Sequence, residues 1–265
     1  MHGMEEVLSL DLMENDFLYR IRRDSRIVYV SVLHADIVPA GERTDSFRIL
    51  SHLRVVPKWD DHWTTLTVRK GSDGVIQSIA DEFQPHSLNT KLLDGQNPNY
   101  YDIMSLELLD RISARVSRVS LGSKTSIMKI AMFQYEIRYL QREVSVYTLL
   151  ASRGFRLAPK VLGHVYEEQK DRTIGFLMED ISGTEPGMDD LEACQKTIRL
   201  LHGYGVLHGD AHRYNFLMTS SGAIVFDFEA ATVKDAEEVK ESMESDNEIG
   251  SMEEKFKDDS GIGKY

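Results

Sequence analysis

The fold of this chain is decided by the stretch LHGDAHRYNF, residues 207–216, together with AIVFDFEAA, residues 223–231. These segments place Asp210, Asn215 and Asp227 at fixed offsets. Between Asn215 and Asp227, two short apolar runs flank the turn-forming sequence TSSG. This pattern predicts a β-hairpin whose open end brings Asn215 and Asp227 side by side. An ordinary hairpin with polar ends would explain that pattern, but not the His-Gly-Asp sequence that precedes it.

This segment resembles the catalytic loop and metal-binding strand of protein-kinase-like phosphotransferases, because H-G-D-x-H-x-x-N followed by D-F-E matches them in order and spacing. The resemblance is closest to the aminoglycoside and choline kinase branch and to small fungal kinase-like proteins. It implies phosphoryl transfer from ATP with Mg²⁺, which needs a carboxylate near the attacking hydroxyl and oxygen ligands for the metal. Asp210 is then the catalytic residue that orients the acceptor hydroxyl and accepts its proton. Asn215 and Asp227 are implied to bind the metal.

The resemblance also implies a strand lysine that pairs with the nucleotide phosphates. Residues 125–131 (TSIMKIA) form a β-favouring run with Lys129 in the corresponding place. The preceding residues 116–121 alternate apolar and polar side chains, which predicts an antiparallel partner strand. A lone strand lysine is usually a surface residue. We assign Lys129 to the nucleotide site because it precedes Asp210 and Asp227 along the chain, as the resemblance implies for the phosphate-binding lysine.

A helix glutamate is implied to hold that lysine. Residues 133–151 have apolar side chains at helical spacing and predict an amphipathic helix. Glu136 and Glu143 are both candidates on this helix. We favour Glu143, because the surrounding REVSVYTLL resembles the E-x-x-x-Y-x-x-L pattern of this superfamily. Its implied role is an ion pair with Lys129, and the alternative is a solvated helix carboxylate.

The adenine-binding linker is implied to follow the apolar strand predicted at residues 173–178 (TIGFLM). The sequence FLMEDISG resembles the hinge of small-molecule kinases. Backbone groups near Met178, Glu179 and Asp180 are therefore implied to bind adenine. Residues 189–201 then predict a helix with an acidic start, and this helix leads into the opening motif.

The sequence departs from the kinase pattern in three places. The expected position of the glycine-rich phosphate loop, residues 109–115 (LDRISAR), contains no glycine. Glu229 replaces the glycine of D-F-G, where it could restrict the loop or contribute near the metal. Only 36 residues follow Glu229, so we expect the helical large lobe to be reduced or shortened.

Composition excludes several classes of function. The chain has 265 residues, of which 42% are hydrophobic and 28% charged, as is typical of soluble globular proteins. No run approaches the length of a membrane span, so no membrane association is expected. The net charge of −12 argues against nucleic-acid binding. The single cysteine, Cys194, cannot form an internal disulfide, which predicts a cytoplasmic, intracellular location and a buried structural role.

Together these patterns predict an α+β, bilobal protein-kinase-like fold. We expect an antiparallel β-sheet small lobe, a reduced helical large lobe and a β-rich amino-terminal extension. The divisions expected are 1–100 for the extension, 101–232 for the kinase-like core (small lobe 101–178, hinge 179–184, large lobe 185–232) and 233–265 for an acidic tail. This tail is poor in large apolar residues, so we expect a helix in its first part and disorder in most of it.

The leading functional hypothesis is an ATP- and Mg²⁺-dependent kinase that acts on a hydroxyl of a small molecule or of a protein serine or threonine. The alternative is a pseudokinase, a nucleotide-binding interaction module without turnover. The glycine-free loop favours the alternative, whereas Lys129, Asp210, Asn215 and Asp227 oppose it. The expected partners are a nucleotide, a hydroxyl-bearing acceptor, and a protein bound through the amino-terminal extension or the acidic tail.

Overall fold

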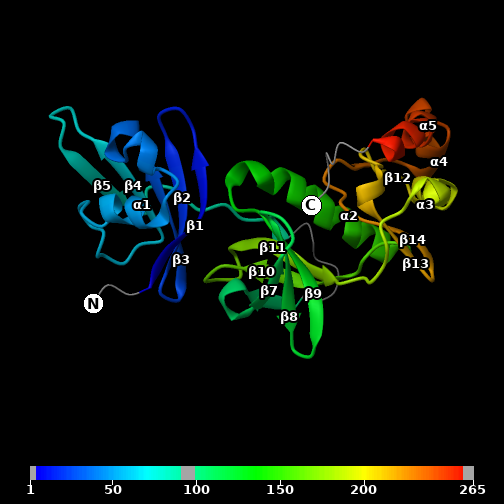
Figure 1. Ribbon diagram of the computed structural model, residues 1–265, viewed down its shortest axis with the longest axis horizontal. Coiled ribbons are helices and arrows are strands. Elements are labelled where there is room, and N and C mark those ends of the chain that lie inside the picture. Colours follow the sequence, from blue (N-terminus) through cyan, green and yellow to red (C-terminus); the bar gives the residue numbers. More distant parts are fainter. Residues whose placement is uncertain (1–3, 91–98, 259–265) are drawn as a thin grey trace.

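The computed structural model describes residues 4–90 and 99–258. The chain is mixed α/β, with sheets and helices, as the sequence predicts at this coarse level. Figure 1 shows a sheet unit formed by the amino-terminal residues, a second sheet crossed by the long helix α2, and a group of helices and short strands from the carboxyl-terminal part. In the described ranges, no helix combines the length and apolar character needed to cross a membrane.

The amino-terminal unit is a five-stranded sheet with helix α1 packed against it. The strand order is β1-β2-β3-β4-β5, with β3 and β4 parallel and the other neighbours antiparallel. The bounds are Glu5–Leu12 (β1), Phe17–Arg23 (β2), Arg26–Val32 (β3), Ser46–Leu53 (α1), Thr65–Lys70 (β4) and Ile76–Ala80 (β5). Residues 22–25 separate two β-favouring runs, a pattern that predicts a hairpin. Strands β2 and β3 form it, with Asp24 in the left-handed region at its turn (φ 54°). Trp59 and Trp63 are each only 1% exposed in the core of this unit.

The second sheet has six strands in the order β6-β10-β11-β9-β8-β7. The bounds are Tyr100–Asp102 (β6), Glu107–Arg111 (β7), Val116–Leu121 (β8), Lys124–Ile130 (β9), Val161–Tyr166 (β10) and Thr173–Glu179 (β11). The predicted strands on either side of the helix are β9 and β11, which pair antiparallel and place Phe176 opposite Lys129. The turn-rich sequence of residues 85–102 predicts a linker. Residues 91–98 of this segment lie outside the described residues, and its end forms the edge strand β6 instead of a loop.

Helix α2, Gln134–Ser152, packs against β10 and β11 and matches the helix predicted at residues 133–151. Its buried face carries Leu140, Glu143, Val144 and Tyr147, which recur every three or four residues. Glu143 therefore lies among apolar side chains on the face that meets the sheet.

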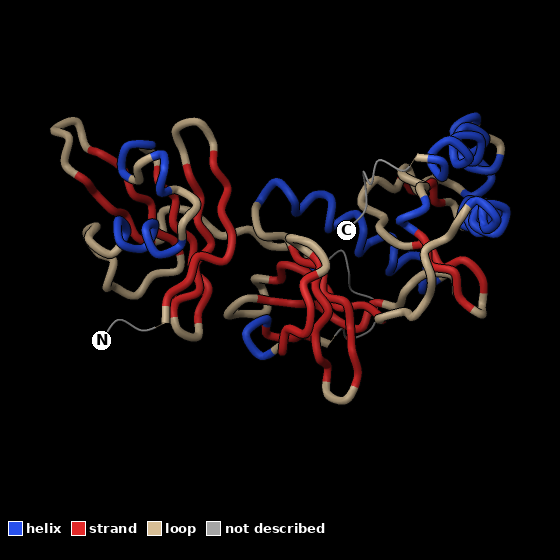
Figure 2. The backbone as a smooth tube through the Cα atoms, viewed as in Figure 1, coloured by secondary structure: helices blue, strands red, loops and turns tan. Residues whose placement is uncertain are grey.

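The carboxyl-terminal part begins with helix α3, Leu191–Gly203, close to the predicted residues 189–201. Strands β12 (Val206–Leu207) and β15 (Thr232–Val233) pair antiparallel. Strands β13 (Phe216–Thr219) and β14 (Gly222–Val225) form the hairpin predicted from the opening motif. The tube in Figure 2 shows these short strands surrounded by helices and loops.

The prediction of a largely disordered tail at residues 233–265 is wrong for the part that the structure describes. Helices α4 (Ala236–Lys240) and α5 (Met243–Lys257) follow β15 and pack against α3. Ile249, Met252 and Phe256 recur at helical spacing, and the last two are fully buried in the main core. The average composition of the tail is polar, but this narrow apolar stripe is sufficient to dock one helix face. The helical carboxyl-terminal part therefore extends beyond residue 232.

Buried ion pairs join the amino-terminal unit to the second sheet. Glu167, directly after β10, is fully buried and accepts from the Arg20 guanidinium of β2 at 2.5 Å. The hydroxyl of Tyr29 donates to the same carboxylate at 2.8 Å, and Arg172 adds a contact at 2.9 Å. The amino-terminal unit therefore has its own core but is fixed to the turn between β10 and β11.

Replacing Phe256 with alanine should lower the free energy of unfolding of the carboxyl-terminal part by about 3–5 kcal/mol, because it removes a buried aromatic ring and leaves a cavity. Met243→Ala, at an exposed position on the same helix, is the matched control and should change stability by less than about 0.5 kcal/mol. Urea unfolding followed by circular dichroism measures both. The two tryptophans of the chain lie in the amino-terminal unit, so their fluorescence should show an unchanged transition there. Equal effects of the two substitutions would contradict the packing of α5.

Candidate active site

A cleft of about 630 Å³ lies between the second sheet and the β13–β14 hairpin. Apolar side chains line it from both sides: Ile112, Val116 and Ile127 from the sheet, and Leu217, Ile224 and Phe226 from the hairpin region. Six of the eight residues predicted for the site also line it, namely Lys129, Glu143, Met178, Glu179, Asp180 and Asp227. A concave apolar slot with a few charged groups has the character of a small-molecule site.

The predicted hinge connects the sheet to the helical part along the border of this cleft. The backbone N–H of Glu179 donates to the carbonyl of Lys160 at 3.0 Å. The carboxylate of Asp180 accepts from Arg118 of β8 at 2.8 Å. Within residues 4–90 and 99–258, no acceptor meets the backbone N–H of Ile181, which leaves it available to a ligand.

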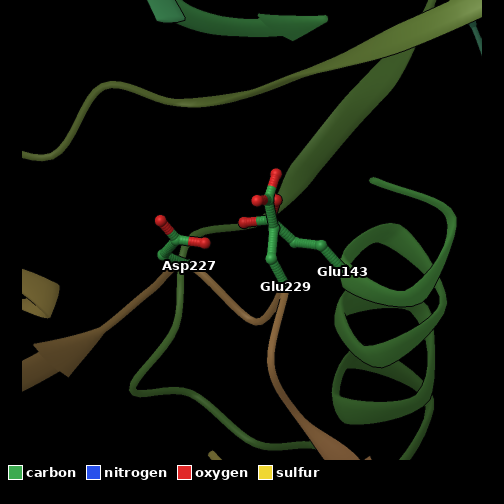
Figure 3. A group of neighbouring side chains, drawn as sticks. All are labelled: Glu143, Asp227 and Glu229. Carbon is green, nitrogen blue, oxygen red and sulfur yellow. The ribbon is translucent and has the colours of Figure 1, made fainter. Parts of the chain in front are cut away.

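The ammonium of Lys129 is the centre of the charged part of the cleft. Its Nζ lies 2.7 Å from Glu143, 3.0 Å from Asp227 and 3.1 Å from Glu229. Figure 3 shows these three carboxylates gathered together, one from α2 and two from the segment after β14. The structure thus places the favoured Glu143 beside Lys129, whereas Glu136 accepts from two backbone N–H groups at the start of α2.

Burial and neighbouring charges shift the pKa values of Lys129 and Glu143 in opposite directions. Burial alone would lower the pKa of Lys129, but the carboxylates of Glu143, Asp227 and Glu229 together hold that pKa above its ordinary value. Burial raises the pKa of Glu143 to about 7, although Lys129 opposes the change. In the described part of the chain, neither oxygen of Glu143 accepts a well-aligned hydrogen bond, so charge attraction is what holds this pair together.

Asp227 is held in a strained backbone conformation, with φ at +65° in the left-handed region. The next residue, Phe228, is fully buried, and its ring meets that of Tyr147 edge-on at 4.9 Å between centroids. The N–H of Asp227 also points to the Tyr147 hydroxyl at 3.4 Å. Strain of this kind persists only where surrounding contacts impose it, and it gathers at functional sites.

In the loop before β13, the Asp210 side chain is half exposed and lies outside the lining of the main cleft. His212 lies 3.3 Å from one of its oxygens and Lys255 lies 4.0 Å from the other. The hydrogen bond with His212 lowers the pKa of Asp210 despite partial burial, so this group is an ionised carboxylate at neutral pH. An ionised, accessible carboxylate can accept a proton from a bound hydroxyl.

Asn215 joins this loop to the hairpin. Its Nδ2 donates to the carbonyl of Asp210 at 2.9 Å, and its own carbonyl accepts from the N–H of Phe226 at 3.1 Å. The hairpin register therefore brings Asn215 beside the residue that precedes Asp227. The amide oxygen of Asn215 and the carboxylate of Asp227 are of the hard oxygen type that Mg²⁺ prefers, and the carboxylates that the structure gathers within 4.8 Å of one another are those of Glu143, Asp227 and Glu229.

Glu248 of α5 was not predicted, although it holds in place the loop that precedes Asp210. Its carboxylate accepts from the backbone N–H groups of His208 and Gly209 at 3.2 and 2.5 Å, and from His202 at 2.7 Å. Burial would raise its pKa, but these donors hold it below the ordinary value. Local sequence gave no signal for this role, because Glu248 is one of many acidic residues in the tail.

A second cavity of about 430 Å³, lined mainly by polar residues, lies next to the loop that precedes Asp210. It is bounded by Gly209, by β12 and β15, and by one face of α5. The polar side chains that line it come from Thr232, Lys234, Glu244, Asn247, Glu248, Ser251 and Lys255. Because Lys255 also contacts Asp210, this cavity adjoins the predicted catalytic residue.

The chain matches no protein-family model and no curated protein sequence. Its function has to be inferred from the residues of the two cavities.

Glu143→Gln should change how stability depends on pH. Because the folded pKa of Glu143 is raised to about 7 from its ordinary value, its contribution to stability is present at low pH and is lost as pH rises through 7. The wild type should therefore lose stability relative to Glu143→Gln between about pH 5 and pH 8, by on the order of 2 kcal/mol. Urea unfolding at a series of pH values measures the difference. A constant difference across this range would show that Glu143 does not titrate there.

Glu248→Ala should lower the free energy of unfolding by about 3 kcal/mol, because it leaves His202 and two backbone N–H groups without their acceptor. Glu253→Ala, on the exposed side of the same helix, should have an effect near zero. Chemical denaturation of the two variants tests this. Similar small effects of the two substitutions would show that Glu248 does not stabilise this loop.

Proposed function

We propose that this protein is an ATP- and Mg²⁺-dependent phosphotransferase of protein-kinase-like fold that acts on a hydroxyl acceptor. In this proposal the second sheet and α2 form the small lobe, residues 179–184 are the hinge, and the carboxyl-terminal helices and hairpin form the large lobe. The observation that carries the proposal is the buried ion pair of Lys129 and Glu143, 2.7 Å apart, beside Asp227 in the cleft. Phosphoryl transfer requires positioned charge more than covalent chemistry, and this cluster supplies it.

In this proposal each group of cleft residues has a separate role. The apolar walls enclose the adenine, with the Ile181 N–H as a backbone donor at the hinge. Lys129 holds phosphate oxygens, and Glu143 keeps the ammonium in position. Asp227 and Asn215 hold Mg²⁺, which neutralises charge on the transferring phosphoryl group. Asp210 orients the acceptor hydroxyl and accepts its proton.

The cavity beside Asp210 supports a small polar acceptor more than a protein side chain. Its lining combines hydroxyl, amide, ammonium and carboxylate groups, which suit a molecule with several hydroxyl or amino groups. Its volume of about 430 Å³ is that of a metabolite site.

A pseudokinase is the second candidate, and one observation favours it. Three carboxylates surround the Lys129 ammonium, and the preceding loop lacks glycine, so phosphate does not have open access to the lysine. We prefer the catalytic alternative, because Asp210 is ionised and accessible and Asn215 is held beside the hairpin that carries Asp227.

Thermal denaturation with MgATP tests nucleotide binding, since a ligand at about 100 times its Kd stabilises the native state by about 2.7 kcal/mol. Wild type should show this shift, and Asp227→Ala should lose its Mg²⁺-dependent part. Asp210→Asn should keep the shift but lose turnover by at least about a hundredfold against a panel of hydroxylated metabolites. Asp189→Asn, at an exposed position outside both cavities, is the control.

The outcomes separate the two candidates. Binding without turnover in both wild type and Asp210→Asn would favour the pseudokinase. The absence of any shift at millimolar MgATP would contradict both candidates.

A further inference from the structure

The loop between β7 and β8 brings an arginine to the place where kinase-like proteins have glycine. Arg115, the last residue before β8, has a side chain only 21% exposed. Its Nη2 donates to both carboxylate oxygens of Glu229, at 2.6 and 2.8 Å. A glycine-free loop cannot rely on close approach of its backbone to phosphate. This loop instead carries a side chain with five N–H donors suited to oxyanions.

Arg115 and Lys129 contact the same oxygen atom. Oε1 of Glu229 lies 2.6 Å from Arg115 Nη2 and 3.1 Å from Lys129 Nζ. One anionic oxygen therefore lies between two cations, Arg115 from the loop before β8 and Lys129 from β9. Paired charged donors of this kind are the usual means by which proteins bind phosphate oxygens.

Burial indicates which carboxylate can leave this position. Glu143 is fully buried on α2, whereas the Glu229 side chain is 21% exposed. The backbone carbonyl of Glu229 accepts from Arg142 of α2 at 2.8 Å, so the backbone can stay in place while the side chain rotates. Arg115 would also remain, because it has a second partner in the buried Glu136 at 3.7 Å.

We propose that Arg115 and Lys129 form an oxyanion site for a phosphate oxygen, and that the Glu229 carboxylate occupies this site in the nucleotide-free protein. Arg115 thereby replaces the backbone amides of a glycine-rich loop. The identity of the ligand as a nucleotide phosphate rests on the proposed function, whereas the two-cation site rests on the contacts above. When a nucleotide binds, a phosphate oxygen displaces the Glu229 carboxylate from this position. Glu229 therefore competes with phosphate for Arg115 and Lys129.

Isothermal titration with three ligands tests the exchange: MgATP, adenosine, and inorganic tripolyphosphate, which carries the phosphate chain without the base. Glu229→Gln should bind MgATP and tripolyphosphate at least about fivefold more tightly, because the competing charge is removed. Arg115→Ala should bind both at least about tenfold more weakly. Adenosine affinity should stay the same in both variants.

Arg111→Ala is the matched control, because Arg111 is an exposed arginine at the end of β7, four residues before Arg115. Arg115→Lys keeps the positive charge and provides a second variant if Arg115→Ala proves poorly folded. It should lose less affinity than the alanine variant but not regain the wild-type value, because lysine has fewer N–H donors and lacks the Nε atom that faces Glu136.

Two results would overturn the proposal. Equal affinities of Arg115→Ala and Arg111→Ala for MgATP and tripolyphosphate would remove Arg115 from phosphate binding. Weaker MgATP binding by Glu229→Gln would mark Glu229 as a supporting ligand of the metal instead of a competitor.

The ligand series also separates this proposal from the proposed function. If wild type binds neither adenosine nor MgATP, but Glu229→Gln binds tripolyphosphate through Arg115, the nucleotide function is wrong and the oxyanion site stands. If every variant binds MgATP as the wild type does, the oxyanion site is wrong and the nucleotide function stands.

Discussion

The buried ion pair between Lys129 and Glu143 is the contact on which the rest of the site depends. Both side chains are at most 2% exposed, and a charge at such a depth is strongly destabilising unless its partner is in place. The pair therefore fixes the rotation of α2 against the sheet. That rotation also directs Tyr147 toward Asp227 and places Glu136 within reach of Arg115. One helix orientation thus sets three parts of the cleft at once.

Much of this arrangement was predictable from local patterns in the sequence. The β13–β14 hairpin follows from two apolar runs around a turn, and α2 follows from helical spacing. Burial alone does not separate Glu143 from Glu136, because both are buried on α2; they differ in that Glu136 accepts from backbone N–H groups at the start of the helix. The kinase-like fold and chemistry remain proposals, because the chain matches no family model and no curated protein.

The rest depends on contacts between distant parts of the chain. Arg115 and Glu229 are 114 residues apart, and no periodic pattern links them. The role of Glu248 could not be predicted for a different reason. Composition averaged over the tail is acidic and polar, so it predicts disorder. Helix formation there depends on only a few apolar residues, including Met252 and Phe256, whose burial requires the surface of α3. Tertiary packing, which a local pattern does not encode, decided both features.

The Arg20–Glu167 contact determines how freely the amino-terminal unit can be exchanged over evolution. The unit has its own sheet and core, which would normally make it a portable module. Yet each side of the junction contributes a charge that is buried against the other. Replacing the unit by an unrelated domain would leave Glu167 without its partners. The two units are therefore expected to have been inherited together, and changes at Arg20, Tyr29, Glu167 and Arg172 should be correlated among related chains.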